Sequence, residues 1–326
     1  MPSIAYDATN QKLLFATLNQ ANGNRGHIFV CNKDGTGCTH ADISGGAGAN
    51  SGHDPQLLVD STNSRLLIVT RNQSGGSRPL LLRCNMDGTG CTNTDISGGA
   101  PANSGQQPKA ILDTVNNKIL VVTRHQASNS KPNLFRCNLD GTGCTFTDIS
   151  ATAGNNSGYD PDVVIDTINN KLLTVTRDQG NGSLLALFRC DLDGTGCTYT
   201  DISAGAGANS AFEPSAAIDT SAQKLMVVTR NQSNADRLTL FRCDLDGTGC
   251  TFADASDGAG ASSGFEPALL IESGMQTFAV VARNNGNADK LSFFRCNMSV
   301  SSCQHYDISS GKGAGSGKTP SAMYLP

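Results

Sequence analysis

The sequence contains no tryptophan, and aromatic residues of all kinds make up only 5% of its 326 residues. Many sugar-binding proteins stack their ligand on tryptophan, so this absence counts against that type of site. Charged residues amount to 16%, the net charge is −4, and no basic cluster is present to hold a phosphate backbone. We therefore expect no nucleic-acid partner. No apolar run approaches the roughly 18 residues of a membrane span, so we expect none.

The N-terminus has neither the basic start nor the long apolar stretch of a signal peptide. If the protein is secreted, we expect its signal to have been removed.

What the sequence has in quantity is glycine, with 36 residues, and twelve cysteines in six equally spaced pairs. The first cysteine of each pair lies 53 residues after the first cysteine of the preceding pair, and its partner follows seven residues later. The predicted disulfides are Cys31–Cys38, Cys84–Cys91, Cys137–Cys144, Cys190–Cys197, Cys243–Cys250 and Cys296–Cys303. Even, paired cysteines indicate an oxidising compartment, so we predict an extracellular, cell-surface or periplasmic protein.

Two other interpretations of the cysteines are weaker. Two thiolates with six residues between them supply only half of a tetrahedral zinc site, and the five histidines share no repeat position that could complete it. Redox catalysis is disfavoured because six equivalent pairs lack the Cys-x-x-Cys spacing. In the Asp34-Gly35 turn, a two-residue hairpin places Cys31 directly opposite Cys38. A bulge at Gly37 would relieve strain in that bridge.

Prolines open the repeats, which we place at 2–54, 55–107, 108–160, 161–213, 214–266 and 267–319. In the fourth repeat, Asp162–Ile165, Leu172–Thr176, Leu184–Cys190 and Cys197–Ile202 read as four short strands separated by turns. A 53-residue period of four antiparallel strands predicts an all-β, six-bladed β-propeller forming one domain over 1–326. A sandwich leaves the strict period unexplained, and a β-solenoid usually has shorter coils.

The repeat resembles the YWTD and NHL propellers. The likeness lies in a proline, a short run closed by aspartate, a hydrophobic run ending in threonine, and a later Leu-Asp-Gly-Thr hairpin: Pro161, Asp166, Leu173–Thr176 and Leu192–Thr195. The Tyr-Trp-Thr-Asp tetrapeptide is absent, and the cysteine pair is no part of that pattern. The resemblance implies the fold and the blade number, and no site residue. Those families are mostly protein-binding scaffolds, which favours a binding role.

The tail after the sixth repeat, 320–326, is a spare first strand. Residues 1–7 and 320–326 compete for one closing position. Because the N-terminal copy keeps its hairpin turn, we expect it to hold that position. The tail then lies elsewhere, begins further repeats, or adds to the sheet of a second copy.

One rim is predicted to gather polar side chains, because the connections between second and third strands and between blades share one face. Arginines end the second strands, glutamines follow them, and acids precede the prolines: Arg71, Arg124, Arg177, Arg230, Arg283; Gln73, Gln126, Gln179, Gln232; Asp54, Asp160, Glu213, Glu266. Arginine forks and side-chain amides could bind sugar hydroxyls or a carboxylate. The other interpretation is that each arginine pairs with an acid of its own or an adjacent blade and ties the loops down.

The Asp-Gly-Thr-Gly turn resembles half of a calcium loop, with Asp193 and Asp246 as weak ligand candidates. No glutamate closes the loop, so a plain turn is preferred and no cofactor is expected.

These observations favour a secreted or surface-exposed, non-catalytic scaffold that binds protein or glycan through its loop face. The first alternative is an assembly module whose C-terminal strand links protomers. The second is a multivalent lectin or a sialidase-like glycan hydrolase. A hydrolase of that type needs a tyrosine–acid pair, and no tyrosine shows such a grouping in the sequence: Tyr6, Tyr159, Tyr199, Tyr306, Tyr324.

Overall fold

The computed structural model describes residues 2–272, 275–299, 302–309 and 311–323. These residues form six sheets, each of four antiparallel strands in chain order. The fold is therefore all-β and that of a six-bladed β-propeller, as predicted. No helix in the described residues is both long and apolar enough to cross a membrane.

The chain divides into two compact units, one ending at Ile149 and the other beginning at Ser150. That the chain forms a single domain over 1–326 stays a prediction. In unit 1, blade 1 consists of β1 (Ser3–Asp7), β2 (Lys12–Asn19), β3 (Arg25–Asn32) and β4 (Thr39–Asp42). Blade 2 consists of β5 (His53–Asp60), β6 (Arg65–Asn72), β7 (Arg78–Asn85) and β8 (Thr92–Asp95). Blade 3 consists of β9 (Gln106–Asp113), β10 (Lys118–His125), β11 (Lys131–Asn138) and β12 (Thr145–Asp148).

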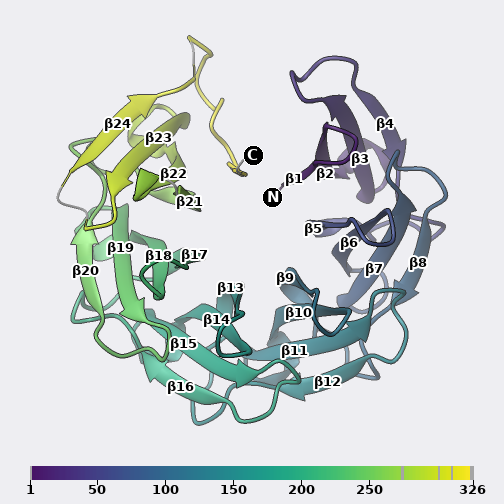
Figure 1. Cartoon of the computed structure of the whole chain (residues 1–326), viewed down its shortest axis with the longest axis horizontal. Helices are drawn as coiled ribbons and strands as arrows, with labels where there is room; N and C mark the ends of the chain where they lie inside the picture. Colours follow the sequence, from purple (N-terminus) through teal and green to yellow (C-terminus); the bar gives the residue numbers. More distant parts are fainter. Residues whose placement is uncertain (1, 273–274, 300–301, 310, 324–326) are drawn as a thin grey trace. The chain divides into compact units, whose positions relative to one another are not determined.

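Unit 2 repeats this plan. Blade 4 consists of β13 (Tyr159–Asp166), β14 (Lys171–Asp178), β15 (Leu184–Asp191) and β16 (Thr198–Asp201). Blade 5 consists of β17 (Phe212–Asp219), β18 (Lys224–Asn231), β19 (Arg237–Asp244) and β20 (Thr251–Asp254). Blade 6 consists of β21 (Phe265–Glu272), β22 (Thr277–Asn284), β23 (Lys290–Asn297) and β24 (Cys303–Asp307). The first strands β13, β17 and β21 lie side by side in this unit, and β16, β20 and β24 lie at the other edge of their blades (Figure 1).

The second strands explain why the apolar runs are continuous. In β6, Leu66 and Ile68 pack in one core with blade 1, whereas Leu67 and Val69 pack in another core with blade 3. In β18, Leu225 and Val227 pack toward blade 4, and Met226 and Val228 toward blade 6. Successive side chains of a strand point to opposite faces, so a strand covered on both faces needs apolar residues at every position.

First strands of neighbouring blades are joined by the residue after the proline. The Ser3 hydroxyl accepts a hydrogen bond from the Leu57 amide at 2.9 Å. In unit 2, Asp162 accepts from the Ala216 amide at 2.8 Å, and Ser215 from the Leu269 amide at 3.1 Å. Backbone groups at a strand edge need a partner when they are shielded from water, and these side chains supply it.

One disulfide staples the hairpin between the third and fourth strands of every blade, with Cα atoms 4.0–4.1 Å apart. The turn differs from the predicted two-residue form. Asn32 accepts from the Gly35 amide and donates to the Thr36 carbonyl, so the loop residues are Lys33, Asp34 and Gly35. Gly35 has a φ of 80°, which suits the last residue of a three-residue loop. Gly37 also takes a left-handed φ, 59°, at the position where a bulge was expected.

Residues 3–7 form β1 and pair with β2, so the N-terminal copy supplies the first strand of its own blade. Pro320–Met323 belong to no strand, and residues 324–326 of the predicted spare strand lie outside the described residues. The role of 320–326 stays a prediction.

Candidate functional site

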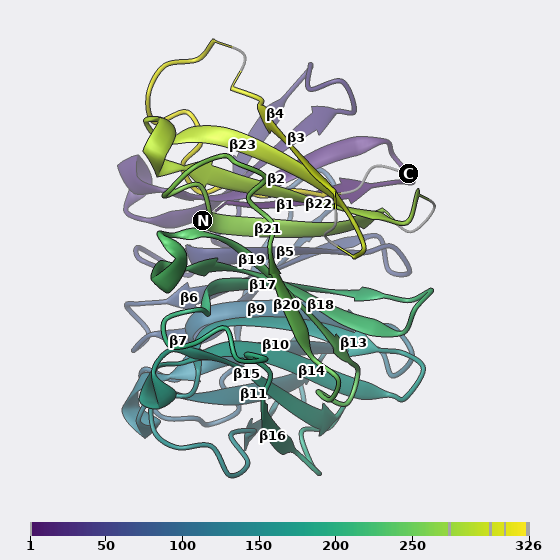
Figure 2. The same cartoon turned by 90° about the vertical axis from the view of Figure 1, so that its left-hand side faces the viewer.

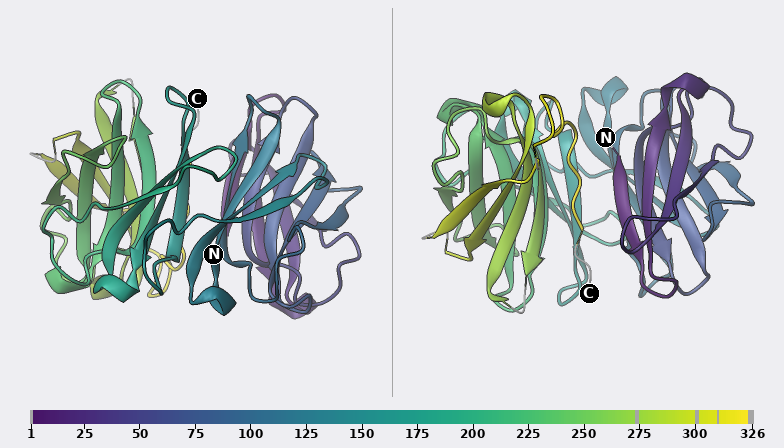
Figure 3. Two further views of the ribbon diagram at one scale, coloured as in Figure 1. Left: turned by 90° about the horizontal axis from the view of Figure 1, so that it is seen from below. Right: turned by 90° about the horizontal axis from the view of Figure 1, so that it is seen from above.

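The loop rim is the end of the blades that carries the connections from second to third strand and from fourth strand to the next blade. One-turn helices mark it. In unit 2, η3 (Gln179–Asn181), η4 (Gln232–Asn234) and η6 (Asn285–Asn287) lie at the same end of their blades (Figure 2). In unit 1, η1 (Gln20–Asn22) and η2 (Gln126–Ser128) also share one end (Figure 3).

In blades 2 to 6, a β-bulge in the first strand redirects the side chain of the residue before the proline. The residue before the proline has a left-handed φ: Asp54 at 52°, Gln107 at 52°, Asp160 at 49°, Glu213 at 53°, Glu266 at 51° and Thr319 at 49°. In unit 2, for example, the register of β13 with β14 shifts between Tyr159 and Asp162. Proline cannot donate to a ladder and is found at such bulges, and a bulge redirects its side chains.

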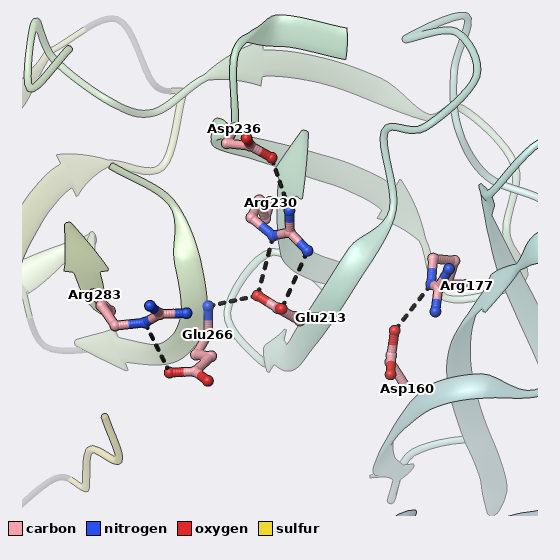
Figure 4. A network of polar contacts seen from close by, with 7 residues as sticks. All are labelled: Asp160, Arg177, Glu213, Arg230, Asp236, Glu266 and Arg283. Atoms are coloured by element: carbon pink, nitrogen blue, oxygen red, sulfur yellow. Dashed lines mark hydrogen bonds and ion pairs between the residues drawn. The ribbon is translucent and has the colours of Figure 1, made fainter. Parts of the chain in front are cut away.

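Four of the predicted arginines pair with the acid of their own blade. Arg71 contacts Asp54 and Arg177 contacts Asp160, both at 2.9 Å. Arg230 holds Glu213 through two nitrogens at 3.2 and 3.3 Å, and Arg283 contacts Glu266 at 3.3 Å (Figure 4). In blade 3, Gln107 stands where blades 2, 4, 5 and 6 have an acid, so Arg124 has no carboxylate at that position. These contacts agree with the interpretation in which the arginines pair with acids of the chain and hold the loops in place.

The pairs in blades 5 and 6 are joined into a longer network. Arg230 also contacts Asp236 at 2.8 Å, and Arg283 contacts Asp289 at 2.9 Å. Glu213 accepts from the amide of Glu266 at 2.6 Å (Figure 4). Glu266 in turn accepts from the amide of Thr319 at 2.8 Å. Each carboxylate therefore fixes an arginine and the bulge of the next repeat together.

Aromatic rings alternate with these arginines along unit 2. The Arg177 guanidinium lies 4.9 Å from the Tyr159 ring and 4.5 Å from the Phe212 ring. Arg230 lies 4.7 Å from Phe212 and 4.4 Å from Phe265, and Arg283 lies 4.8 Å from Phe265. A guanidinium over an aromatic face at such distances is attracted to it. Arg177, Arg230 and Arg283 thus each contact both an acid and an aromatic ring of the chain.

The predicted glutamines lie apart from this network. Gln73, Gln126, Gln179 and Gln232 are exposed, and each donates its backbone N–H to the carbonyl of an asparagine in the preceding loop at 2.8–3.0 Å. No hydrogen bond joins their side chains to the arginines in the described part of the chain. The predicted set of arginines and glutamines is therefore not brought together as one site.

The hairpin aspartates have a local role. The Asp193 and Asp246 carboxylates each accept from the amide and the hydroxyl of the threonine two residues on, at 2.9 and 2.7 Å. These hydrogen bonds hold the pKa of Asp246 below its usual range. The described residues contain no cluster of three potential metal ligands. The geometry at both calcium candidates is that of an aspartate-capped turn.

Blade 4 contains a pair that the sequence analysis missed. The Tyr199 hydroxyl donates to Asp178 at 2.9 Å, and the other Asp178 oxygen accepts from the Asn181 amide at 3.1 Å. Burial is the main cause that raises the pKa of Asp178. Burial and the Asp178 carboxylate raise the pKa of Tyr199 to about 12. The expectation that no tyrosine is grouped with an acid is therefore wrong at Tyr199.

The signal that could have revealed this pair is a break in the repeat. The other blades have asparagine or histidine at the position of Asp178, namely Asn19, Asn72, His125, Asn231 and Asn284. At the position of Tyr199 they have His40, Asn93, Phe146, Phe252 and His305. Blade 4 alone combines a carboxylate with a phenol.

Two open pockets lie on the rim of blade 4. One, of about 470 Å³, is lined by Asp178, Tyr199, Asn181 and the loop from Thr152 to Asn156. The other, of about 400 Å³, is lined by Asn181, Leu184, Asp201, Ser203 and small residues of the following loop. Pockets of this size suit a small ligand or a single large side chain.

No protein-family model matches the chain, and no curated protein shows significant sequence similarity to it. Solved structures are similar in fold. A putative 6-phosphogluconolactonase from Bacteroides uniformis has a TM-score of 0.59 at 12% identity, over 93% of this chain and 83% of that one. A protein of unknown function from Dyadobacter fermentans has 0.53 at 12%, over 90% and 89%.

A puromycin hydrolase has a TM-score of 0.59 at 12% identity, over 93% of this chain but only 46% of its own. At such identities these comparisons support the propeller fold alone.

Proposed function

We propose that the protein is a secreted or surface-exposed scaffold that binds a protein or glycan ligand through its loop rim and catalyses no reaction on it. The oxidising compartment indicated by six disulfides is consistent with that location. The observation that carries the proposal is the pair of pockets on the rim of blade 4, where the repeat is broken. A loop on a rigid scaffold that departs from its repeat is a natural place for a ligand.

The engaged arginines support a binding platform rather than a reactive centre. Each of the rim arginines Arg177, Arg230 and Arg283 already contacts a carboxylate and at least one aromatic ring, so this part of the rim is held in place before a ligand arrives. Preorganised groups lose less freedom on binding than mobile ones.

The Tyr199–Asp178 pair is the strongest argument for the hydrolase alternative, because a hydroxyl within hydrogen-bond reach of a carboxylate is the arrangement of a nucleophile and its base. Against that alternative, the rim arginines Arg177, Arg230 and Arg283 are already paired with acids of the chain. A phenol that attacks a sugar must be activated by losing its proton. Burial and the Asp178 carboxylate raise the pKa of Tyr199 to about 12, and the neutral phenol donates a hydrogen bond to Asp178. In this arrangement Tyr199 serves as a hydrogen-bond donor.

The test is an array of defined glycans and extracellular proteins probed with the wild-type protein and with a Tyr199→Phe, Asn155→Ala variant. We expect specific binders whose signal falls with the variant. The matched control is Phe252→Leu, at the position of blade 5 that is equivalent to Tyr199. Absence of binders, together with concentration-dependent polymers that disappear on deletion of Pro320–Pro326, would instead support the assembly module.

A further inference from the structure

Each fourth strand ends in an aspartate, and in five blades a basic residue starts the third strand. The aspartates are Asp42, Asp95, Asp148, Asp201, Asp254 and Asp307. The basic residues are Arg25, Arg78, Lys131, Arg237 and Lys290. In blade 4 the basic residue is replaced by Leu184.

Four of these blades show what the aspartate does. Arg25 contacts Asp42 at 3.6 Å, and Arg78 contacts Asp95 at 3.9 Å. The equivalent pairs in unit 2 are Arg237 with Asp254 at 3.6 Å and Lys290 with Asp307 at 3.5 Å. In four of the five blades that have a basic residue at this position, the rim carboxylate therefore receives its cationic side chain.

Asp201 keeps the geometry of these aspartates without the cation. One of its oxygens accepts from the Ser203 amide at 2.9 Å, as Asp254 accepts from the Ser256 amide at 2.8 Å. Within the described ranges Asp201 makes no ion pair. In blades 5 and 6 the second oxygen also accepts from an asparagine amide, at 3.0 and 3.2 Å. Among the described residues, the equivalent Asn181 makes no such hydrogen bond to Asp201, and its backbone amide donates to Asp178.

The space beside Asp201 is open. Leu184 and Asp201 line the pocket of about 400 Å³, with Asn181 and Ser203 beside them. The adjoining pocket of about 470 Å³ adds Asp178, and the two pockets share Asn181. Two carboxylates and no lysine or arginine line these pockets. Their charge therefore favours a cationic group over an anionic one.

We propose that blade 4 binds an arginine side chain of a partner polypeptide, whose guanidinium takes the place at Asp201 that arginine or lysine of the chain itself takes in other blades. Three of the four observed pairs use arginine, whose planar fork suits a carboxylate. Leu184 offers an apolar wall to the methylene stem, and the pocket gives it room. This inference rests on the proposed use of the loop rim as a binding surface.

The test measures binding of a capped arginine, Nα-acetyl-arginine N-methylamide, by calorimetry or by NMR titration. The matching citrulline derivative has nearly the same shape without the charge, and glucosamine represents a cation carried by a sugar. We expect capped arginine to bind at least tenfold more tightly than the citrulline derivative and than glucosamine. Equal binding of arginine and citrulline, or tighter binding of glucosamine, would overturn the proposal.

Variants locate the site. Leu184→Arg restores the basic residue found at this position in the other blades and should weaken capped-arginine binding at least tenfold by filling the site from within. Asp201→Asn should weaken it similarly. Asp254→Asn, the same change in blade 5, should leave it unchanged. A melting temperature close to wild type shows that Leu184→Arg has folded, as five blades with a base at this position lead us to expect.

If Leu184→Arg and Asp201→Asn bind capped arginine as wild type does, the assignment to blade 4 is wrong. The array separates this failure from that of the proposed function. Specific binders that persist with Leu184→Arg would leave the rim as a binding surface while removing the arginine site from it.

Discussion

The loop rims of the two units use the same arginine–acid pair but surround it differently. In unit 2, Arg230 is 12% exposed, contacts two acids and lies between two phenylalanine rings. In unit 1, Arg71 contacts one acid among the described residues, Asp54, which is 37% exposed. His53 stands where unit 2 has an aromatic ring of tyrosine or phenylalanine. The arginine–acid pair that both rims share fixes the bulge, so it stabilises the fold. The parts that differ are where a function specific to one unit should be sought.

The largest expected effect comes from the feature that the two units share. Closing so short a loop should contribute roughly 2–3 kcal/mol per bridge on the chain-entropy model. Strong reductant should therefore lower the melting temperature substantially while far-UV circular dichroism below the transition stays that of a β protein. Because each blade has one bridge, both units should be affected alike. An unchanged melting temperature in reductant would remove the disulfides from the account of stability.

The second prediction compares the arginines directly. Arg230→Ala leaves Glu213 and Asp236 without their cation in a partly buried place and should cost about 2 kcal/mol, less than a fully buried pair. Arg71→Ala should cost about 1 kcal/mol, because Asp54 is better hydrated. Urea denaturation of both variants measures the difference. Equal losses would mean that the second acid and the rings of unit 2 add nothing.

The third prediction isolates the rings. Phe212 lies over both Arg177 and Arg230, so Phe212→Leu should cost about 1 kcal/mol through lost cation–π attraction. His53→Leu, at the same position in unit 1, is the matched control and should change stability by less. A larger loss of stability for His53→Leu than for Phe212→Leu would contradict this prediction.

The smallest effect concerns pH. Burial raises the pKa of Asp178, so the folded protein holds this proton more tightly than the unfolded chain does. The contribution of this group to stability is greatest below the ordinary aspartate pKa of about 3.9 and falls as pH rises through the folded-state value. Asp178→Asn should match wild type at low pH and be slightly more stable near neutrality. Asn231, which caps η4 in the same way, indicates that asparagine fits.

The exposed turn aspartates act in the opposite direction. Hydrogen bonds from Thr142 lower the pKa of Asp140, as those from Thr248 lower the pKa of Asp246. Their contribution is present above the ordinary aspartate pKa and is lost as pH falls through the folded-state value. A variant that lacks Asp178 should show the loss of stability in acid without the opposing contribution of Asp178, whereas an Asp178→Asn curve identical in shape to wild type would contradict the raised pKa.

The repeat made most of the fold predictable. Strict spacing, paired cysteines and turn residues located the strands and the bridges, because each depends on residues close in sequence. The turn was less predictable. Asp34-Gly35 favours a two-residue hairpin, but an additional left-handed glycine, Gly37, allows the longer loop to keep Cys31 and Cys38 together. The last blade keeps Cys296 opposite Cys303 with a different turn sequence.

The candidate site was only half predictable. The arginines and their acids were recognised, but choosing between a ligand site and internal pairs required the bulge that aims Asp160 and Glu213. The aromatic rings were missed because Tyr159 pairs with Arg177 only through that bulged register. Leu184 and Asp178 were missed because they differ from the residues at the same position of the other repeats, and the prediction considered only residues that recur.

The most direct test of the central claim is an NMR titration of the isotopically labelled protein with capped arginine, followed at backbone amides. An arginine site at blade 4 predicts amide shifts that saturate and cluster at residues 181–184 and 201–205. The amide signals of the equivalent residues 22–25 and 42–46 of unit 1 should not shift, because the Arg25 guanidinium already contacts Asp42. Shifts of equal size at both places, or none at blade 4, would contradict it.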